Sequence, residues 1–168
     1  MTVEPPAPAT EPTRRPAPAE RPPRANDWRV AVWRGFLRAH SVVMADLERE
    51  LVTRTGLSLG RYDVLLQLAE APHHRLRMAD LADRVLLSRS GLTRLVDRLQ
   101  AEGLVRREPS PDDARGTYTA LTDAGYRRLR DAAPVHLAGI REHWLRHFDD
   151  EELRTLGELL TRVLPGSE

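Results

Sequence analysis

The chain has 168 residues, of which 40% are apolar and 30% are charged, and its formal net charge is +1. This composition is typical of a globular protein with a core, and the near-neutral balance does not by itself indicate a nucleic-acid partner. Cysteine is absent, which excludes disulfides, thiolate metal ligands and thiol redox chemistry.

Residues 1–26 are predicted to form a disordered, proline-rich tail. They hold most of the 13 prolines and few large apolar side chains, so they bury too little surface to order themselves. The segment also lacks the apolar stretch of a secretory signal, and no apolar run in the chain is long enough to span a bilayer. We therefore expect a cytoplasmic location.

A long helix is predicted over residues 27–57, capped by Asn26 or Asp27 and ended by Gly56. Its apolar side chains recur at spacings of three and four and so share one face, from Val32 to Leu51. Ser58 caps a second helix that ends before Pro72.

Two short helices follow, over residues 78–85 and 89–102, with a break at residues 86–88. Ser88 is a suitable N-cap for the second helix and Gly103 a suitable stop. Two short helices joined by a tight turn make a helix-turn-helix. The second helix carries an apolar stripe formed by Leu92, Leu95, Val96 and Leu99.

Residues 104–108 and 117–121 read as β-strands around a charged, turn-rich segment, so they predict a hairpin, or wing. Residues 58–122 are thus expected to be a winged helix-turn-helix domain. Residues 123–165 are expected to form a long helix capped by Thr122 and a last helix opened by acidic residues. The predicted fold class is mainly α with a small β-hairpin wing, an α+β arrangement.

The outward face of the helix after Ser88 is suited to the major groove of DNA. Small side chains at Ser88, Ser90 and Thr93 allow close approach to phosphates and base edges. Arg94 points away from the apolar stripe and is expected to contact the O6 and N7 atoms of a guanine. Arg89 and Arg98 are expected to contact phosphates. The same face also fits an ordinary solvated helix, and the order of helix, turn, helix and hairpin favours DNA.

The hairpin tip contains Asp113 and Arg115. Arg115 is expected to enter the minor groove, as arginines do where that groove is narrow. Asp113 is expected to hold the shape of the tip, through Arg115 or a backbone N–H group. The alternative is a plain turn with no ligand.

From Met78 to Gly125 the sequence resembles the MarR family of bacterial transcriptional regulators, with Asp113-x-Arg115 followed by Leu121-Thr122 as the wing signature. The resemblance implies a homodimer, joined by N- and C-terminal dimerisation helices, that binds a pseudo-palindromic operator. It implies a repressor released by a small-molecule effector that is phenolic or anionic. By the same resemblance, the candidate ligand contacts are Trp28, with Trp33 as the alternative, Asp63, Arg94, and Arg106, with Arg107 as the alternative.

Other functions find less support. A helical protein-interaction module without specific DNA binding is the main alternative, and an enzyme is not expected because phosphate-loop and nucleophile motifs are missing. His136, His143 and His147 share one stripe of a helix, but no complete ligand set accompanies them. The sequence therefore predicts neither a metal nor a cofactor.

Overall fold

A computed structural model describes residues 24–85, 89–109 and 117–164. The predicted tail up to residue 23, the turn at 86–88 with the Ser88 cap, and the wing tip with Asp113 and Arg115 lie outside these residues. The chain divides into two compact units, residues 1–38 and residues 39–168.

The described part of the first unit contains the start of helix α1 (Trp28–Thr55). Asp27 caps it as predicted, since its Oδ1 accepts a hydrogen bond of 2.9 Å from the backbone N–H of Arg29. Hydrogen bonds from Arg29 also lower the pKa of the Asp27 carboxyl. Trp33 and Phe36 stack with ring centroids 5.8 Å apart. Helix α1 therefore begins with a defined cap and an aromatic pair.

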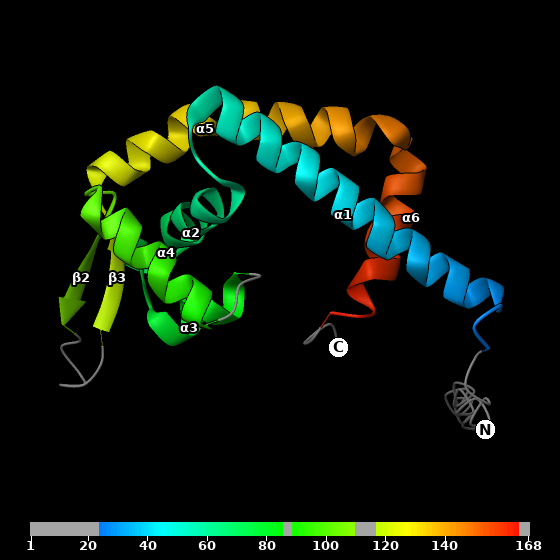
Figure 1. Ribbon diagram of the computed structural model, residues 1–168, viewed down its shortest axis with the longest axis horizontal. Helices are drawn as coiled ribbons and strands as arrows, with labels where there is room; N and C mark the ends of the chain where they lie inside the picture. The colour runs from blue at the N-terminus through cyan, green and yellow to red at the C-terminus, as the bar shows by residue number, and fades with distance from the viewer. Residues whose placement is uncertain (1–23, 86–88, 110–116, 165–168) are drawn as a thin grey trace, which may run out of the picture. The chain divides into compact units, whose positions relative to one another are not determined.

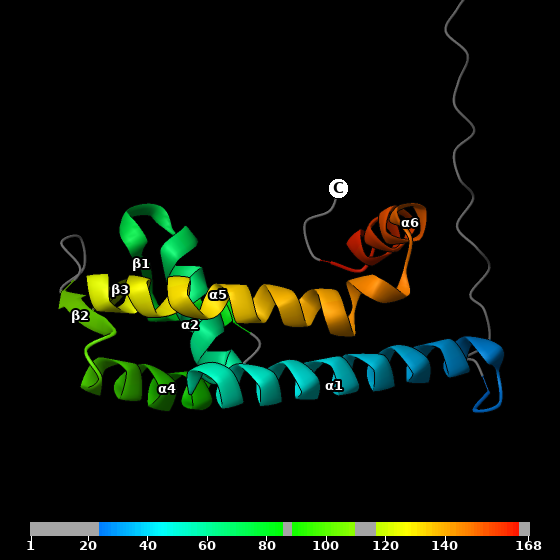
Figure 2. The same cartoon turned by 90° about the horizontal axis from the view of Figure 1, so that it is seen from above.

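In the second unit, α1 ends at Gly56, whose φ of +69° places it in the left-handed region that glycine adopts without strain. Helix α2 (Leu59–Glu70) follows, with Ser58 as its N-cap. The backbone N–H of Leu59 donates to Glu48 Oε2 at 2.5 Å and so joins the two helices. Helix α2 lies between α4 and α5 (Figure 1 and Figure 2) and forms the centre of the core.

Between α2 and the next helix, the structure contains a short 3-10 helix (Pro72–His74) and strand β1 (Arg75–Arg77). Helix α3 (Met78–Arg84) and helix α4 (Arg89–Ala101) come next, close to the predicted bounds. Gly103 ends α4 with a φ of +72°. The two short helices of the predicted helix-turn-helix are confirmed.

The wing strands β2 (Val105–Pro109) and β3 (Thr117–Leu121) pair antiparallel, as predicted. The sheet has a third strand, however, because β1 pairs with the other edge of β3 in the order β1-β3-β2. The predicted fold class is confirmed, but the two-stranded hairpin is corrected to a three-stranded sheet. The missed strand has only three residues, too few for a recognisable alternating pattern.

Thr122 caps helix α5 (Asp123–His143), and a 3-10 helix (Leu145–His147) continues it. The last element, α6 (Asp150–Thr161), begins with a capping box formed by Asp149 and Glu152. Leu137 of α5 is 61% exposed, whereas Gly139 faces α1, where an added Cβ would lie 2.8 Å from Leu47 Cδ2.

Replacing Thr122 with alanine is expected to lower the free energy of unfolding by about 1 kcal/mol. Its hydroxyl accepts from the backbone N–H of Gly125 at 3.0 Å and donates to the carbonyl oxygen of Leu104. Urea unfolding would measure the loss. Thr122→Ser keeps the hydroxyl and should retain most of the stability; equal losses in both variants would contradict a capping role.

No helix in the described ranges is both long and apolar enough to cross a membrane.

Candidate nucleic-acid interface

Helix α4 is held against the domain by a continuous apolar stripe. Leu92, Val96 and Leu99 are fully buried, and they belong to the same core cluster as the buried residues of α2. Burying each such side chain contributes about 1.5–3 kcal/mol, so the rotation of α4 about its axis is strongly determined. This confirms the predicted inward face.

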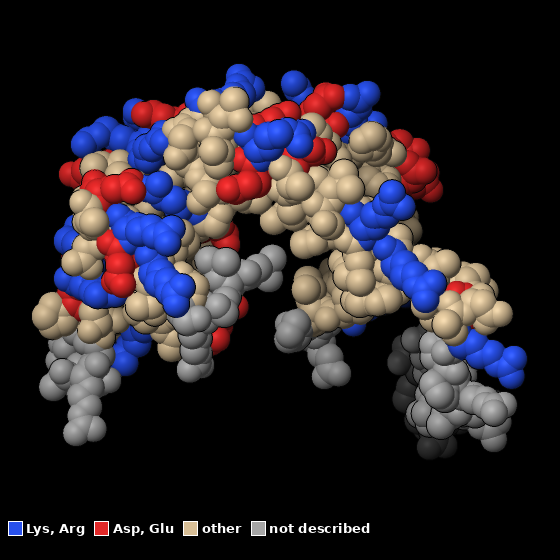
Figure 3. Space-filling model, in the orientation of Figure 1, with Lys and Arg blue, Asp and Glu red and all other residues tan. Residues whose placement is uncertain are grey.

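The opposite face of α4 is exposed and carries Thr93, Arg94 and Arg98. Arg89 and Ser90 lie in the first turn of the helix. Figure 3 shows arginine side chains over α4 and the hairpin strands, with acidic side chains among them. The surface therefore carries both positive and negative charges. Its candidate DNA contacts are identified by their position on the exposed face of α4 and not by an overall basic charge.

Two side-chain contacts connect the sheet to the helix-turn-helix. Arg107 of β2 forms an ion pair of 2.6 Å with Asp97 on α4. Thr119 of β3 is fully buried, and its hydroxyl donates to the sulfur of Met78 at the start of α3, at 3.2 Å. The first contact reaches α4 and the second reaches α3. Together they fix the orientation of the hairpin strands relative to these two helices.

One face of the sheet is lined by arginines around an aromatic ring. The guanidinium groups of Arg75 and Arg77 lie 4.9 and 5.4 Å from the ring centre of Tyr118, within cation–π range. Glu108 accepts from Arg106 at 2.8 Å and from Arg75 at 3.3 Å. The Arg106 hydrogen bond, with a smaller contribution from Arg75, lowers the pKa of the Glu108 carboxyl. Arg75 and Arg77 are not among the predicted site residues, because strand β1 was not predicted from the sequence.

The predicted ligand contacts are not all gathered at one place. Asp63 lines a cavity of about 500 Å³ in the second unit, and neither Arg94 nor Arg106 is among its lining residues. Arg106 instead pairs with Glu108. Trp28 belongs to the first unit. The ligand site predicted from these four residues therefore stays a prediction, and Asp63 is the residue of the four that lines this cavity.

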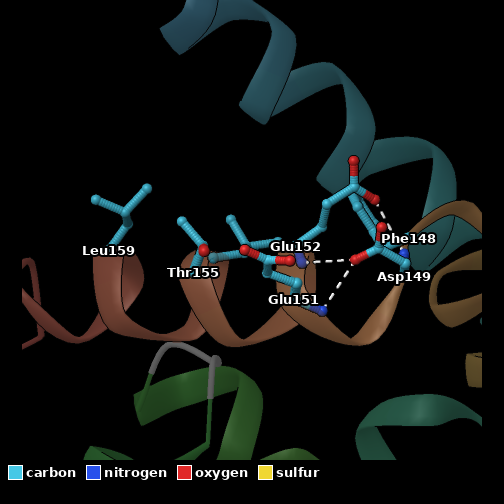
Figure 4. Close-up of a pocket in the computed structure, with 7 residues that line it drawn as sticks. Phe148, Asp149, Glu151, Glu152, Thr155 and Leu159 are labelled. Atoms are coloured by element: carbon cyan, nitrogen blue, oxygen red, sulfur yellow. Dashed lines mark hydrogen bonds between the residues drawn. The ribbon is translucent and has the colours of Figure 1, made fainter.

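A second, shallower depression of about 450 Å³ lies along α6 (Figure 4). Glu152 and Asp149 at one end are engaged in the capping box, with Asp149 Oδ1 accepting from the backbone of Glu151 and Glu152. Leu156 and Leu159 provide its apolar part. Because two of its three carboxylates, those of Asp149 and Glu152, serve the helix start, this depression presents mainly an apolar helix face.

Two of the three histidines on the predicted stripe, His136 and His143, contact side chains of other helices. His143 lies 2.8 Å from Glu50 and 3.8 Å from Asp46, both on α1, and the ring of His136 lies 4.4 Å from that of Tyr62. Across residues 24–85, 89–109 and 117–164, no group of three or more His, Asp or Glu side chains is placed to hold a metal ion.

Comparisons with known proteins agree on one family. Residues 55–116 match the model of the MarR family. The chain is 32% identical over 111 residues to the HTH-type transcriptional repressor YetL of Bacillus subtilis, and this stretch covers 64% of the chain and 66% of YetL, just under two thirds of that relative.

Two solved structures extend the similarity over most of the chain. Sco3205, a MarR family transcriptional regulator from Streptomyces coelicolor crystallised in complex with DNA, matches with a TM-score of 0.77 and 37% identity over 84% of this chain and 89% of that one. AbsC, a MarR family regulator from the same organism, matches with a TM-score of 0.75 and 32% identity over 82% of this chain and 93% of its own.

Proposed function

The chain belongs to the MarR family of transcriptional regulators, and from this premise we propose that it represses transcription as a homodimer bound to a pseudo-palindromic operator in double-stranded DNA. It is a DNA-binding regulator rather than an enzyme, as the sequence predicted. We place it in the cytoplasm, where such a regulator meets DNA. We also propose that a small molecule releases it from the operator.

One observation carries this proposal: α4 buries one face completely and exposes the other beside the sheet. An exposed helix with arginines opposite a rigid apolar stripe is suited to the major groove, which admits a single α-helix. Ser88, Arg89, Ser90, Thr93, Arg94 and Arg98 are the proposed contacts of this helix and its cap. Asp113 and Arg115, outside the described residues, are proposed for the wing.

Exposed apolar side chains support the proposed dimer. Trp28 is 73% exposed, and large apolar side chains are also exposed along α1 and in and after α6. Large exposed apolar patches mark sites of contact with proteins, membranes or ligands. The terminal helices are therefore the proposed dimerisation elements, and a closed two-fold dimer would present two copies of α4 to successive turns of DNA.

Similarity to Sco3205, which was crystallised with DNA, weighs against the alternative of a protein-interaction module without specific DNA binding. Selection from a random duplex pool, followed by anisotropy across a salt series, tests the proposal. We expect a two-fold-symmetric site with half-sites about one helical turn apart. Weak, sequence-blind binding that disappears at physiological salt would contradict it.

Replacing Arg115 with alanine is expected to weaken binding to all duplexes by a similar factor and to reduce the slope of log affinity against log salt by about one per protomer. The reason is that an arginine in the minor groove acts mainly through charge. Anisotropy titrations at several salt concentrations, on the operator and on a scrambled duplex, measure both effects. An unchanged salt slope would remove Arg115 from the proposed interface.

A further inference from the structure

The cavity that contains Asp63 is large enough for a small organic molecule. Its volume is about 500 Å³, and it lies between α2, the part of α1 after residue 43, and α5. Most of its walls are apolar, contributed by Met44, Leu47, Leu59, Leu66 and Ile140. A cavity of this size and character, with few polar groups, is the usual form of a small-molecule site.

Two aromatic residues form one polar part of the cavity. The rings of Tyr62 and His136 lie 4.4 Å apart at an angle of 44°. Burial lowers the pKa of His136, so its imidazole is neutral near pH 7. Its Nδ1 is buried and has no hydrogen-bond partner among the described residues. In the tautomer that carries the ring proton on Nε2, the neutral Nδ1 accepts a hydrogen bond, which a donor group of a ligand would supply.

Asp63 supplies the other polar part. It is half-buried; burial raises the pKa of its carboxyl, a hydrogen bond with Gln67 opposes this rise, and the charge of Glu70 adds to it. Within the described part of the chain, the cavity has no arginine in its lining. Arg61, two positions away on α2, donates to Glu102 of α4 instead. The cavity thus presents a partly desolvated carboxyl group and no cation.

We propose that this cavity binds a small aromatic or aliphatic molecule through a hydrogen-bond-donating nitrogen, cationic or neutral, and that it selects against carboxylate ligands. A donor would satisfy the Asp63 carboxylate and His136 Nδ1, whereas an anion would meet a like charge in a poorly solvated place. The sequence resemblance implies an effector that is phenolic or anionic, and this cavity disfavours the anionic alternative. This inference deepens the proposed ligand response and depends on it only for the effect on DNA.

Three indoles with one skeleton and different charges test the selectivity. Tryptamine is cationic, indole-3-ethanol is neutral and indole-3-acetate is anionic, and each is titrated by calorimetry into the full chain without DNA. We expect tryptamine to bind at least about tenfold more tightly than indole-3-acetate, with indole-3-ethanol between them, because a charge-assisted hydrogen bond is worth about a tenfold change or more in affinity.

Substitutions assign the selectivity to the cavity. Asp63→Asn should weaken tryptamine binding about tenfold and abolish the preference over indole-3-acetate. Asp131→Asn is the matched control: this exposed carboxylate of α5 pairs with Arg130, outside the cavity, and its loss should leave all three affinities unchanged. His136→Phe keeps a ring beside Tyr62 but removes both nitrogens, and should weaken tryptamine and indole-3-ethanol several-fold. It also provides the test if Asp63→Asn fails to fold, which circular dichroism would reveal.

Three results would overturn the proposal: indole-3-acetate binding as tightly as tryptamine, unchanged affinities in both cavity variants, or no binding of any indole at millimolar concentration. Because the titration contains no DNA, these results leave the proposed function untouched. Conversely, charge-selective ligand binding by a chain that recognises no operator would contradict the proposed function and support the cavity assignment.

Discussion

Replacing Arg94 with alanine is expected to weaken operator binding by about 1–3 kcal/mol and to relax the preference at one base position in each half-site. Arg94 lies on the exposed face of α4, and the burial of Leu92 and Val96 on the other side prevents the helix from rotating it away. An arginine held in this way is placed for a bidentate hydrogen bond to guanine, which a shorter side chain cannot replace.

Anisotropy against the selected operator and a panel of single-base variants measures both effects. Arg130→Ala is the control, because it removes another exposed arginine, one on α5 that pairs with Asp131, and it should leave DNA affinity and base preference intact. If Arg94→Ala bound every duplex as the original chain does, α4 would be wrongly assigned as the recognition helix even though the family is established.

Replacing Gly125 with alanine is expected to destabilise the fold by about 1–3 kcal/mol, since overpacking a filled site forces neighbouring atoms to move. An added Cβ would overlap the carbonyl oxygen of Leu104 and lie 2.8 Å from Leu121 Cδ1. That carbonyl has little freedom to move, because it accepts hydrogen bonds from the backbone N–H and the hydroxyl of Thr122, at 3.2 and 3.0 Å.

Thermal and urea unfolding measure the loss. Gly157→Ala is the matched control on α6, where an added Cβ meets nothing within 4 Å. There the substitution should leave stability unchanged or raise it by up to about 1 kcal/mol, because alanine favours a helix more than glycine does. A Gly125→Ala variant as stable as Gly157→Ala would show that the start of α5 can shift away from Leu104.

The helices of the DNA-binding domain could be predicted because their signals are local. The N-caps Ser58 and Thr122 form the hydrogen bonds that their sequence positions suggest, and Gly103 adopts the positive φ expected of a helix stop. The stripe on α4 is a 3.6-residue pattern confined to one helix. None of these features needs knowledge of which distant residue lies opposite.

Strand β1 shows the opposite case. Arg75, Leu76 and Arg77 become a strand only because β3, more than forty positions later, offers an unpaired edge at Tyr118, Thr119 and Ala120. Strand pairing between distant segments leaves little trace in so short a stretch. The arginine-lined face around Tyr118 depends on this pairing and was missed with it.

The sequence by itself therefore determined the class of fold, the family, and which face of α4 turns outward, since these follow from local periodicity, capping and a recognisable motif. Only the tertiary structure decided which residues the polar side chains contact. It pairs Arg75 of β1 with Glu108 of β2 and places Asp63 and His136 in one apolar cavity. The partner, burial and charge state of a polar group depend on side chains from distant segments, which only the folded packing of the sheet and of α1, α2 and α5 brings together.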